Sequence, residues 1–272
     1  MPGLRPDRFA KAMATGADCV CVDLEDAVAP DRKDEARQLS LPVFGETGLG
    51  RAERVVRINS VRTVDGLRDI LTLSETAHPP DALMLPKIRN AEEVRWLEDV
   101  LSGVPVTFQV IIETTDGLLN AAEIARSSSR ITTLLFGAYD MAAELRASRS
   151  WDSLLYARSR VVHAAAGAGL DVMDVPFLDL QDKPGLEVEA SRSADLGFTG
   201  KAAIHPDQLP AIHNAFSPSD EAVANARRIM EAFAQSKDGL LVVDGKLIEK
   251  PVIRSLQRVL AIHALTQGAG VC

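Results

Sequence analysis

Seven short apolar runs alternate with longer amphipathic segments along most of this 272-residue chain. The runs lie at residues 19–23, 55–59, 82–86, 108–113, 133–137, 170–176 and 198–206. Helical patterns separate them, for example at 91–101, 117–127 and 154–168. Repeated strand–helix units of this kind predict an α/β fold with a parallel sheet and right-handed crossovers. Aromatic residues make up only 4% of the chain, which indicates a core filled by aliphatic side chains.

Polar residues at the ends of nearly all these runs favour a TIM (β/α)8-type barrel over a doubly wound sheet. The active site of a barrel is built at the C-terminal ends of its strands, where such residues meet. They are Asp23, Glu25, Asp26, Arg57, Asn59, Lys87, Glu113, Asp140 and Asp174. A barrel has eight strands, so seven runs leave the first strand missing. We expect either a start upstream of Met1 or an incomplete barrel wall.

The pattern changes after about residue 210, which predicts a barrel domain over 1–210 and a C-terminal extension over 211–272. A loop-like stretch at 214–219 precedes a helical pattern that runs to about residue 235. Residues 240–249 have the pattern of a hairpin with an Asp-Gly turn at Asp244-Gly245. A last helix is expected over about 252–266. The extension is therefore predicted to be a helix–hairpin–helix appendage.

Charge and motif content exclude several classes of protein. The net charge of −8 speaks against a general nucleic-acid-binding protein, which would carry a basic face. No apolar run reaches the roughly 18 residues of a membrane span, and the first residues lack a signal peptide. Dinucleotide-binding, P-loop and nucleophile-elbow glycine motifs do not occur. We expect a cytoplasmic protein that binds neither nucleic acid nor membrane.

Two carboxylates at neighbouring strand ends are candidate metal ligands. Glu113 ends the most apolar run, and Asp140 follows the next one closely. A hard cation such as Mg²⁺ takes one or two carboxylates and completes its coordination with water and substrate oxygens. The alternative is that both acids only cap the helices that follow the strands.

Arg57 and the acids Glu25 and Asp26 are candidates for substrate binding and proton transfer. Arg57 lies within a buried strand, where a cation needs an anionic partner. That partner is either a substrate carboxylate or a barrel acid such as Glu25. Glu25 and Asp26 follow a strand directly, so they could reach the waters of a bound metal or position a base. Their alternative role is to stabilise a helix start.

A basic cluster near the N-terminus contains Arg5, Arg8 and Lys11. Such a patch would suit the phosphates of coenzyme A. A solvated basic face is the alternative.

Several motifs, taken together and in this order, resemble the citrate lyase beta-subunit-like branch of the HpcH/HpaI aldolases, which includes malyl-CoA and citramalyl-CoA lyases. The resemblance covers essentially the whole chain. The matching stretches are PGLRPDRF (2–9), DLEDAV (23–28), RIN (57–59), LPK (85–87), IETTDGL (112–118), FGAYD (136–140), GFTGK (197–201), IHP (204–206) and FSPS (216–219).

The resemblance implies a TIM barrel that forms a homotrimer and uses Mg²⁺ to act on a CoA thioester. It implies that Glu113 and Asp140 hold the metal and that Arg57 binds the keto-acid part of the substrate. Glu113 would contact the substrate through the metal. Glu25 and Asp26 would reach the waters of the metal. A C-terminal segment of the family crosses to the neighbouring subunit and supplies an acid to its active site.

Three departures from the family pattern accompany this resemblance. The family's C-terminal acid is an aspartate two residues before a proline, and here Glu249 precedes Pro251. A glutamate can transfer the same proton over a different reach. Arg89 stands where the family often has an acid, and the first strand is missing.

The function expected is cleavage of a 3-hydroxyacyl-CoA by a carbon–carbon lyase. The favoured substrate is (S)-citramalyl-CoA, which yields acetyl-CoA and pyruvate. The alternatives are a malyl-CoA lyase, a citrate lyase beta subunit acting on a citryl thioester, and, from another class, a non-catalytic CoA-binding protein.

Overall fold

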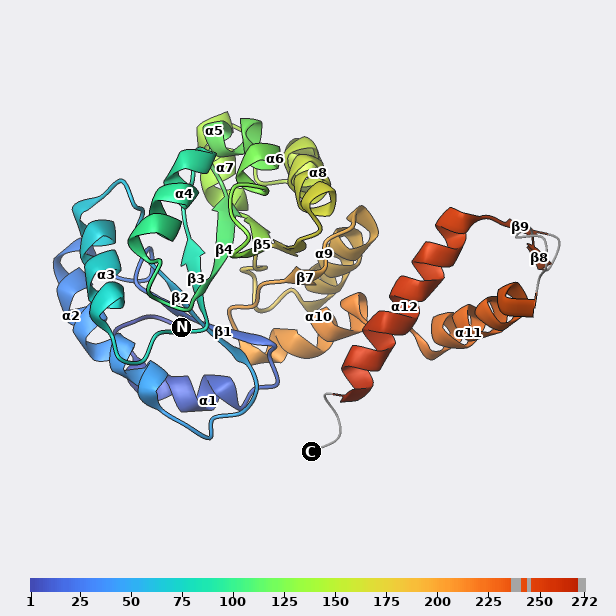
Figure 1. The fold of residues 1–272 in the computed structure, drawn as a ribbon, viewed down its shortest axis with the longest axis horizontal. Coiled ribbons are helices and arrows are strands. Elements are labelled where there is room, and N and C mark those ends of the chain that lie inside the picture. The colour runs from blue at the N-terminus through green and yellow to red at the C-terminus, as the bar shows by residue number, and fades with distance from the viewer. Residues whose placement is uncertain (236–240, 244–245, 269–272) are drawn as a thin grey trace. The chain divides into compact units, whose positions relative to one another are not determined.

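The computed structural model describes residues 1–235, 241–243 and 246–268 (Figure 1). Contacts within the chain divide it into two compact units, Met1–Leu209 and Pro210–Cys272. This boundary lies next to the one expected from the change of sequence pattern near residue 210. Each unit is described by itself below.

Seven parallel strands form the sheet of the first unit, and they follow one another in space in the order of the sequence. The strands are β1 (Cys19–Asp23), β2 (Glu53–Arg57), β3 (Ala82–Leu85), β4 (Thr107–Ile112), β5 (Ile131–Phe136), β6 (Asp171–Asp174) and β7 (Gly200–Lys201). A doubly wound sheet would reverse its strand order at a switch point, so the sequential order agrees with the barrel-like alternative. Closure into a full eight-stranded barrel stays a prediction.

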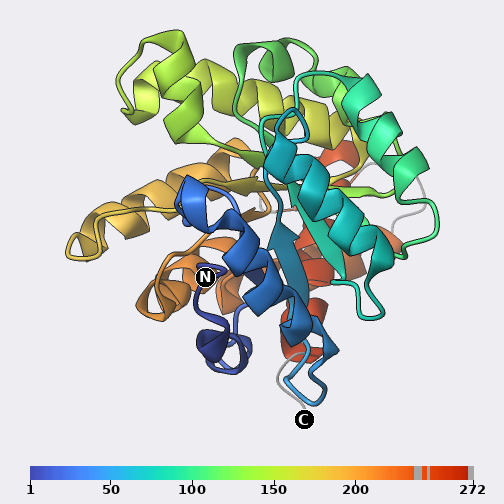
Figure 2. The same ribbon diagram turned by 90° about the vertical axis from the view of Figure 1, so that its left-hand side faces the viewer.

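Helices connect the strands and cover the outside of the sheet; α2 and α3 lie side by side in front of the strands in Figure 2. The α-helices of this unit are α1 (Phe9–Met13), α2 (Lys33–Ser40), α3 (Val64–Glu75), α4 (Ala91–Val100), α5 (Thr115–Leu119), α6 (Ala121–Ile124), α7 (Ala138–Leu145), α8 (Trp151–Ala168) and α9 (Lys183–Leu196). Short 3-10 helices are η1 (Pro6–Arg8), η2 (Pro30–Arg32), η3 (Leu41–Gly45) and η4 (Pro206–Gln208). Helix α10 (Leu209–Phe216) begins at the boundary between the units.

Side-chain caps explain where several helices begin. Thr63, Asn90, Thr114, Ser150 and Asp182 each accept a hydrogen bond from a backbone N–H in the first turn of the following helix. These side chains satisfy donors that the helix itself leaves unpaired. Each helix therefore starts at a defined point after its strand, which positions the strand-end loops.

The first three residues run alongside β1, where the missing strand was expected. Pro2 forms a parallel bridge with Asp23. The Asp23 N–H donates to the Met1 carbonyl at 2.8 Å, and the Gly3 N–H donates to the Asp23 carbonyl at 2.8 Å. A short piece of backbone thus pairs with the outer edge of β1.

Most predicted strands have somewhat different bounds in the structure, and two of them show why. The run at 55–59 forms a strand that ends at Arg57, because Ile58 to Ser60 lead into the capped start of α3. The run at 198–206 contains only the two-residue strand β7, because His205 caps the 3-10 helix that begins at Pro206.

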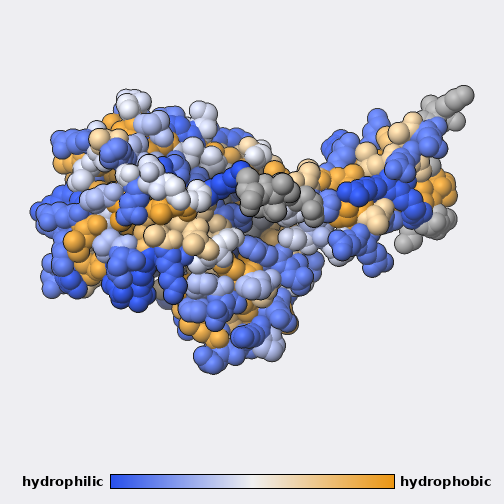
Figure 3. Space-filling view, turned by 90° about the horizontal axis from the view of Figure 1, so that it is seen from below, coloured by the Kyte–Doolittle hydropathy of each residue, from blue (hydrophilic) through white to orange (hydrophobic). Residues whose placement is uncertain are grey.

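Aliphatic side chains from the strands fill the core, as the low aromatic content predicted. Val22, Val56, Leu83, Val110 and Leu134 are all fully buried. The outside is mixed: hydrophilic and hydrophobic residues are interspersed over the face of the first unit seen in Figure 3.

A buried charge network lies at the ends of β6 and β7. Asp174 accepts hydrogen bonds from Arg158 at 3.0 Å, Ser193 at 2.7 Å and Lys201 at 3.2 Å. The side chains of Asp174 and Lys201 are fully buried. Glu189 adds a second anionic partner for Lys201 at 2.7 Å. Because buried charges are costly unless paired, each member depends on the others.

The second unit contains most of α10 together with two longer helices and a two-stranded antiparallel sheet. These further elements are α11 (Asp220–Gln235), β8 (Leu241–Val243), β9 (Lys246–Ile248) and α12 (Lys250–Gly268). Its apolar cluster consists of Ile229, Ile248 and Ile253, against which Met230, Phe233, Val243 and Leu256 pack. The expected turn residues Asp244 and Gly245 lie outside the described residues. Among the residues described, no helix has the length and apolar character needed to cross a membrane.

Removing the shared acceptor of the buried network should destabilise the protein strongly. We expect Asp174→Ala to lower the free energy of unfolding by about 3–5 kcal/mol, because it removes the carboxylate partner of the buried Arg158 and leaves Lys201 with Glu189 alone. Asp152→Ala is the matched control, since Asp152 pairs with Arg192 on the surface and is 86% exposed. This control should cost at most about 1 kcal/mol. Urea unfolding measures both, and equal losses would contradict the assignment.

Candidate active site at the strand ends

Charged side chains gather at the C-terminal edge of the sheet, where the ends of parallel strands meet. Asp23 ends β1 and Arg57 ends β2, while Glu113 directly follows β4 and Lys87 lies two residues after the end of β3. Asp140 lies in the first turn of α7, after β5. The structure therefore brings together Arg57, Glu113 and Asp140, three residues that sequence analysis had selected.

Arg57 is held by Asp23 in a two-pronged ion pair. The two residues are register partners on β1 and β2. Arg57 donates from Nε to Asp23 Oδ1 at 2.8 Å and from Nη2 to Oδ2 at 2.6 Å. Burial alone would raise the pKa of Asp23, but the hydrogen bonds and charge of Arg57 hold it below its usual value. The pair therefore stays charged, and its geometry is fixed along one edge of the guanidinium.

The remaining nitrogen of Arg57 faces two further acids. Nη1 lies 2.9 Å from Glu25 Oε2 and 3.7 Å from Asp26 Oδ2. Glu25 Oε2 is buried and accepts no hydrogen bond among the described residues, so its contact with Arg57 is an ion pair without hydrogen-bond geometry. Burial raises the pKa of Glu25. The salt bridge between Arg57 and Glu25, one of the two alternatives expected for this cation, is present at Nη1.

Lys87 connects the acids of two strand ends. Its ammonium donates to Glu25 Oε1 at 2.6 Å and lies 3.6 Å from Asp26 Oδ1. Its backbone N–H donates to Glu113 Oε1 at 2.9 Å. One residue thus contacts Glu25, Asp26 and Glu113.

Glu113 is buried in a space that only a glycine neighbour allows. Its side chain is packed against Gly137, where an added Cβ would lie 2.4 Å from Glu113 Cβ and 2.5 Å from Oε2. Burial raises the pKa of Glu113 to about 8, and the charges of Glu25 and Asp140 add to the shift. The positively charged groups near Glu113 therefore do not fully balance the negative charge of its carboxylate.

The residues present fit a hard divalent cation. Three acids, Glu25, Glu113 and Asp140, interact electrostatically, and one of them has a buried oxygen without a hydrogen-bond donor. Within the described ranges, no three His, Cys, Asp or Glu side chains form a ready metal cluster. Mg²⁺ does not need one, because it binds through one or two carboxylates and keeps several water or substrate oxygens. Asp26, Lys87 and Asp140 are partly exposed, which gives the site access to solvent.

The remaining predicted site residues are Arg5, Arg8, Lys11 and Glu249. Arg5, Arg8 and Lys11 are exposed, and Arg5 pairs with Asp7 at 2.7 Å. They follow closely after Pro2, which pairs with the end of β1. Glu249 belongs to the second unit, where it is exposed and its carbonyl accepts from the Ile253 N–H at the start of α12.

The sequence did not reveal the pairing of Asp23 with Arg57 or the contacts of Lys87 and Gly137, although each shapes the site. Asp23 and Arg57 occupy the last positions of adjacent strands, so an aligned register of β1 and β2 was the available signal. The glycine before the first turn of α7 was a second signal, since a glycine that follows a strand often marks a close approach. The sequence pattern did not indicate that Lys87 contacts acids through both its backbone N–H and its ammonium.

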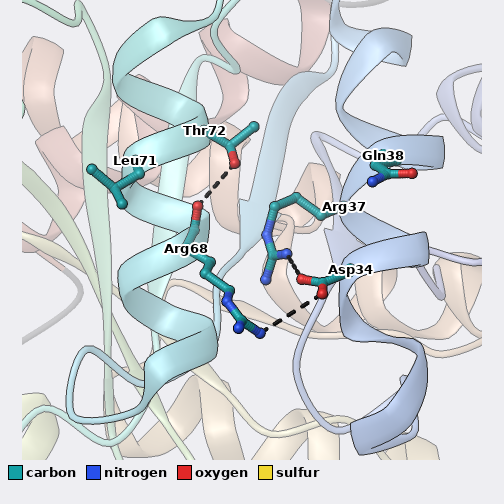
Figure 4. A pocket seen from close by; sticks show the side chains of 6 residues that line it. All are labelled: Asp34, Arg37, Gln38, Arg68, Leu71 and Thr72. Atoms are coloured by element: carbon teal, nitrogen blue, oxygen red, sulfur yellow. Dashed lines mark hydrogen bonds and ion pairs between the residues drawn. The ribbon is translucent and has the colours of Figure 1, made fainter.

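The surface also has a hollow of about 310 Å³ between α2 and α3, away from the strand ends (Figure 4). Asp34, Arg37 and Gln38 of α2 line it opposite Arg68, Leu71 and Thr72 of α3. Arg37 is bound to Asp34 and to the buried Asp69. Acids of α2 and α3 therefore pair with the Arg37 guanidinium. We infer that Arg37 stabilises the packing of these two helices.

The pKa of Glu113 predicts how stability depends on pH without metal. Since this pKa is raised from 4.5 to about 8, the folded protein keeps a proton that the unfolded chain has lost. The stabilising contribution of that proton is complete below pH 4.5 and is lost as the pH rises through about 8. In EDTA, the wild type should lose stability relative to Glu113→Gln between pH 5.5 and pH 8.5. Chemical denaturation at several pH values checks this, and a constant difference would contradict the shift.

Comparisons with known proteins agree with this arrangement. Residues 1–206 match the family model described as HpcH/HpaI aldolase/citrate lyase. The chain is 34% identical to the L-malyl-CoA/beta-methylmalyl-CoA lyase of Cereibacter sphaeroides, over 94% of this chain and 90% of the relative. It is 30% identical to the mitochondrial citramalyl-CoA lyase of Homo sapiens, over 96% and 83%.

A solved structure shows the same likeness in three dimensions. The crystal structure of the protein CitE from Mycobacterium tuberculosis, in complex with magnesium, acetoacetate and coenzyme A, has a TM-score of 0.80 and 35% sequence identity. The match covers 96% of this chain and 95% of the other. The family expected from the motifs is therefore confirmed, and with it the enzyme class of carbon–carbon lyases. This chain belongs to the HpcH/HpaI aldolase/citrate lyase family.

Proposed function

We propose that this protein is a Mg²⁺-dependent lyase that cleaves a carbon–carbon bond of a 3-hydroxyacyl-CoA, with (S)-citramalyl-CoA as its substrate. The observation that carries the proposal is the buried carboxylate of Glu113, which lies near Glu25 and Asp140 and accepts a hydrogen bond from the Lys87 N–H. Relatives named as citramalyl-CoA and malyl-CoA lyases support the substrate class.

Glu113 and Asp140 would hold the cation, and Glu25 and Asp26 would bind its waters. When bound, Mg²⁺ would draw electron density from the hydroxyl and carboxylate oxygens of the substrate and so favour transfer of the hydroxyl proton to a base, a role that Glu25 or Asp26 would take. Gly137 keeps the space in which the carboxylate of Glu113 lies. The solved magnesium complex of CitE supports the choice of metal.

Arg57 would bind the carboxylate of the substrate through Nη1. Asp23 occupies Nε and Nη2, so Nη1 is the nitrogen directed at the other acids of the site. A positive charge at this point favours the keto acid that forms as the carbon–carbon bond breaks. In this reaction the bonding electrons pass to the thioester fragment, which leaves as an enolate.

Glu249 of a neighbouring subunit would protonate the enolate carbon to give acetyl-CoA. Its exposed position at the start of α12 leaves the carboxylate available. Arg5, Arg8 and Lys11 would receive phosphates of coenzyme A, since they are exposed and follow the segment that pairs with β1. The homotrimer and the cytoplasmic location remain predictions.

Identification of the keto acid tests the proposal directly. Purified protein and Mg²⁺ are incubated in turn with citramalyl-CoA, malyl-CoA and citryl-CoA. We expect pyruvate from the first substrate at the highest rate. Glyoxylate or oxaloacetate as the main product would support a malyl-CoA or a citryl thioester lyase instead. Binding of the thioesters without turnover would support the non-catalytic alternative.

Loss of either proposed metal ligand should abolish metal-dependent cleavage. We expect Glu113→Gln and Asp140→Asn to reduce kcat by about 100-fold or more while the circular dichroism spectrum stays unchanged. Asp116→Asn is the matched control, because Asp116 also lies in the first turn of a helix that follows a strand. It should keep near wild-type turnover. Equal effects at Asp116 and Asp140 would indicate that Asp140 only stabilises the start of its helix.

Replacing the proposed proton donor should affect turnover more than binding. We expect Glu249→Gln to lower kcat by about 10²–10⁴-fold with little change in KM. Because the donor would act across subunits, a mixture of Glu249→Gln and Glu113→Gln proteins that exchange subunits should regain activity. Unchanged kcat in the first variant would remove Glu249 from the mechanism, and a mixture that stays inactive would place donor and metal in the same subunit.

A further inference from the structure

The backbone of Lys87 has an unusual conformation. Its φ angle is 57°, in the left-handed region, and Arg146 is the other non-glycine residue of the described chain with a positive φ. Arg146 ends α7, a common place for this conformation. Lys87 instead follows β3 within a loop. Such a conformation is strained in a non-glycine residue, and it persists where surrounding structure enforces it.

This conformation allows one residue to reach two acidic groups through two different atoms. The backbone N–H of Lys87 donates to Glu113 and the ammonium donates to Glu25. Asp26 lies 3.6 Å from the same ammonium. The side chain of Lys87 is 33% exposed, so the ammonium lies at the border between the buried acids and solvent.

The ammonium is also charged and surrounded by the same acids that a metal would use. Burial alone would lower the pKa of Lys87, but the hydrogen bond to Glu25 and the charges of Glu25, Asp26 and Asp140 raise it. Asp140 and Glu25 also act on Glu113. One cationic side chain therefore lies within the field of three acids assigned to the metal and its waters.

We propose that Lys87 is a positioning residue whose ammonium acts as an internal counter-ion, which keeps the acids of the active site in place without metal and competes with Mg²⁺ for them. The inference rests on the proposed function. It predicts that loss of the ammonium changes Mg²⁺ affinity and turnover in opposite directions. Removing the ammonium takes away a positive charge that repels the cation, so Mg²⁺ binds more tightly. Removing it also frees Glu25, so turnover falls.

A residue with a purely structural role would give a different result. Loss of structure around Glu113 would weaken metal binding and turnover together. The opposite signs expected for Lys87 are therefore diagnostic. The size of the effect follows from Coulomb's law: a unit charge near a divalent cation in a partly exposed site is worth about a ten-fold change in affinity or more.

The test is calorimetric titration of Mg²⁺ into the full-length protein. Lys87→Met keeps the backbone N–H and removes the charge, and we expect Mg²⁺ to bind it about ten-fold more tightly than the wild type. Lys87→Arg keeps the charge and should bind Mg²⁺ with near wild-type affinity. Lys87→Gly also removes the ammonium while it relieves the strained φ angle, so it should fold even if Lys87→Met does not. It too should bind more tightly.

Arg95→Met is the matched control for loss of one positive charge. Arg95 lies on the exposed side of α4, where it pairs with Glu92. Its removal should leave Mg²⁺ affinity unchanged, because a distant surface charge is screened by salt. If it tightened binding as Lys87→Met does, the effect would be one of net charge and the proposal would be overturned.

Two further outcomes separate this inference from the proposed function. Wild-type protein that binds Mg²⁺, with equal or weaker affinity in Lys87→Met and Lys87→Gly, would overturn the role of Lys87 alone. Wild-type protein without detectable Mg²⁺ binding would overturn the metal assignment and the inference together. Tighter binding accompanied by a lower kcat in both variants supports the proposal.

Discussion

Repulsion between buried carboxylates is the constraint around which the strand-end site is built. Glu113 is almost fully buried, and its pKa is raised by burial and by the charges of Glu25 and Asp140. A fold keeps such a group only where something compensates for the cost. Here the compensation comes from the Lys87 N–H and from nearby cations, and it is incomplete. A divalent cation would remove the remaining repulsion.

The parallel sheet explains why these residues meet although they are far apart in the sequence. Asp23 and Arg57 are neighbours because β1 and β2 pair in a register that aligns their last residues. Glu113 reaches Lys87 because β3 and β4 are adjacent, and it reaches Gly137 because β4 pairs with β5. Each added strand brings one more functional group to the same edge. The chemistry is therefore distributed over five successive strand–helix units.

Much of this arrangement could be predicted from the sequence, for physical reasons. Buried parallel strands are continuous apolar runs, and the acids and bases that follow them mark the edge where sites form. That reasoning identified Arg57, Glu113 and Asp140. It could not find the two contacts of Lys87, because a left-handed backbone at a lysine has no signature in residue type. It also placed the end of β2 two residues late, since Ile58 continues the apolar run into the loop.

The ion pair between Asp23 and Arg57 fixes the direction of the rest of the guanidinium. Asp23 accepts from Nε and Nη2, so Nη1 is directed at Glu25 and Asp26. Of the two partners expected for this buried cation, the structure shows the barrel acid. Binding of a substrate carboxylate by Arg57 stays a proposal, and it requires a substrate oxygen to share or replace the contact between Nη1 and Glu25.

The location of a bound cation tests the account most directly. A crystal of the protein grown with Mn²⁺ in place of Mg²⁺ would show the metal by its anomalous scattering. The account predicts one strong peak at the strand ends, within coordination distance of carboxylate oxygens of both Glu113 and Asp140. A peak that contacts neither residue, or a fully loaded crystal without a peak at this edge of the sheet, would contradict it.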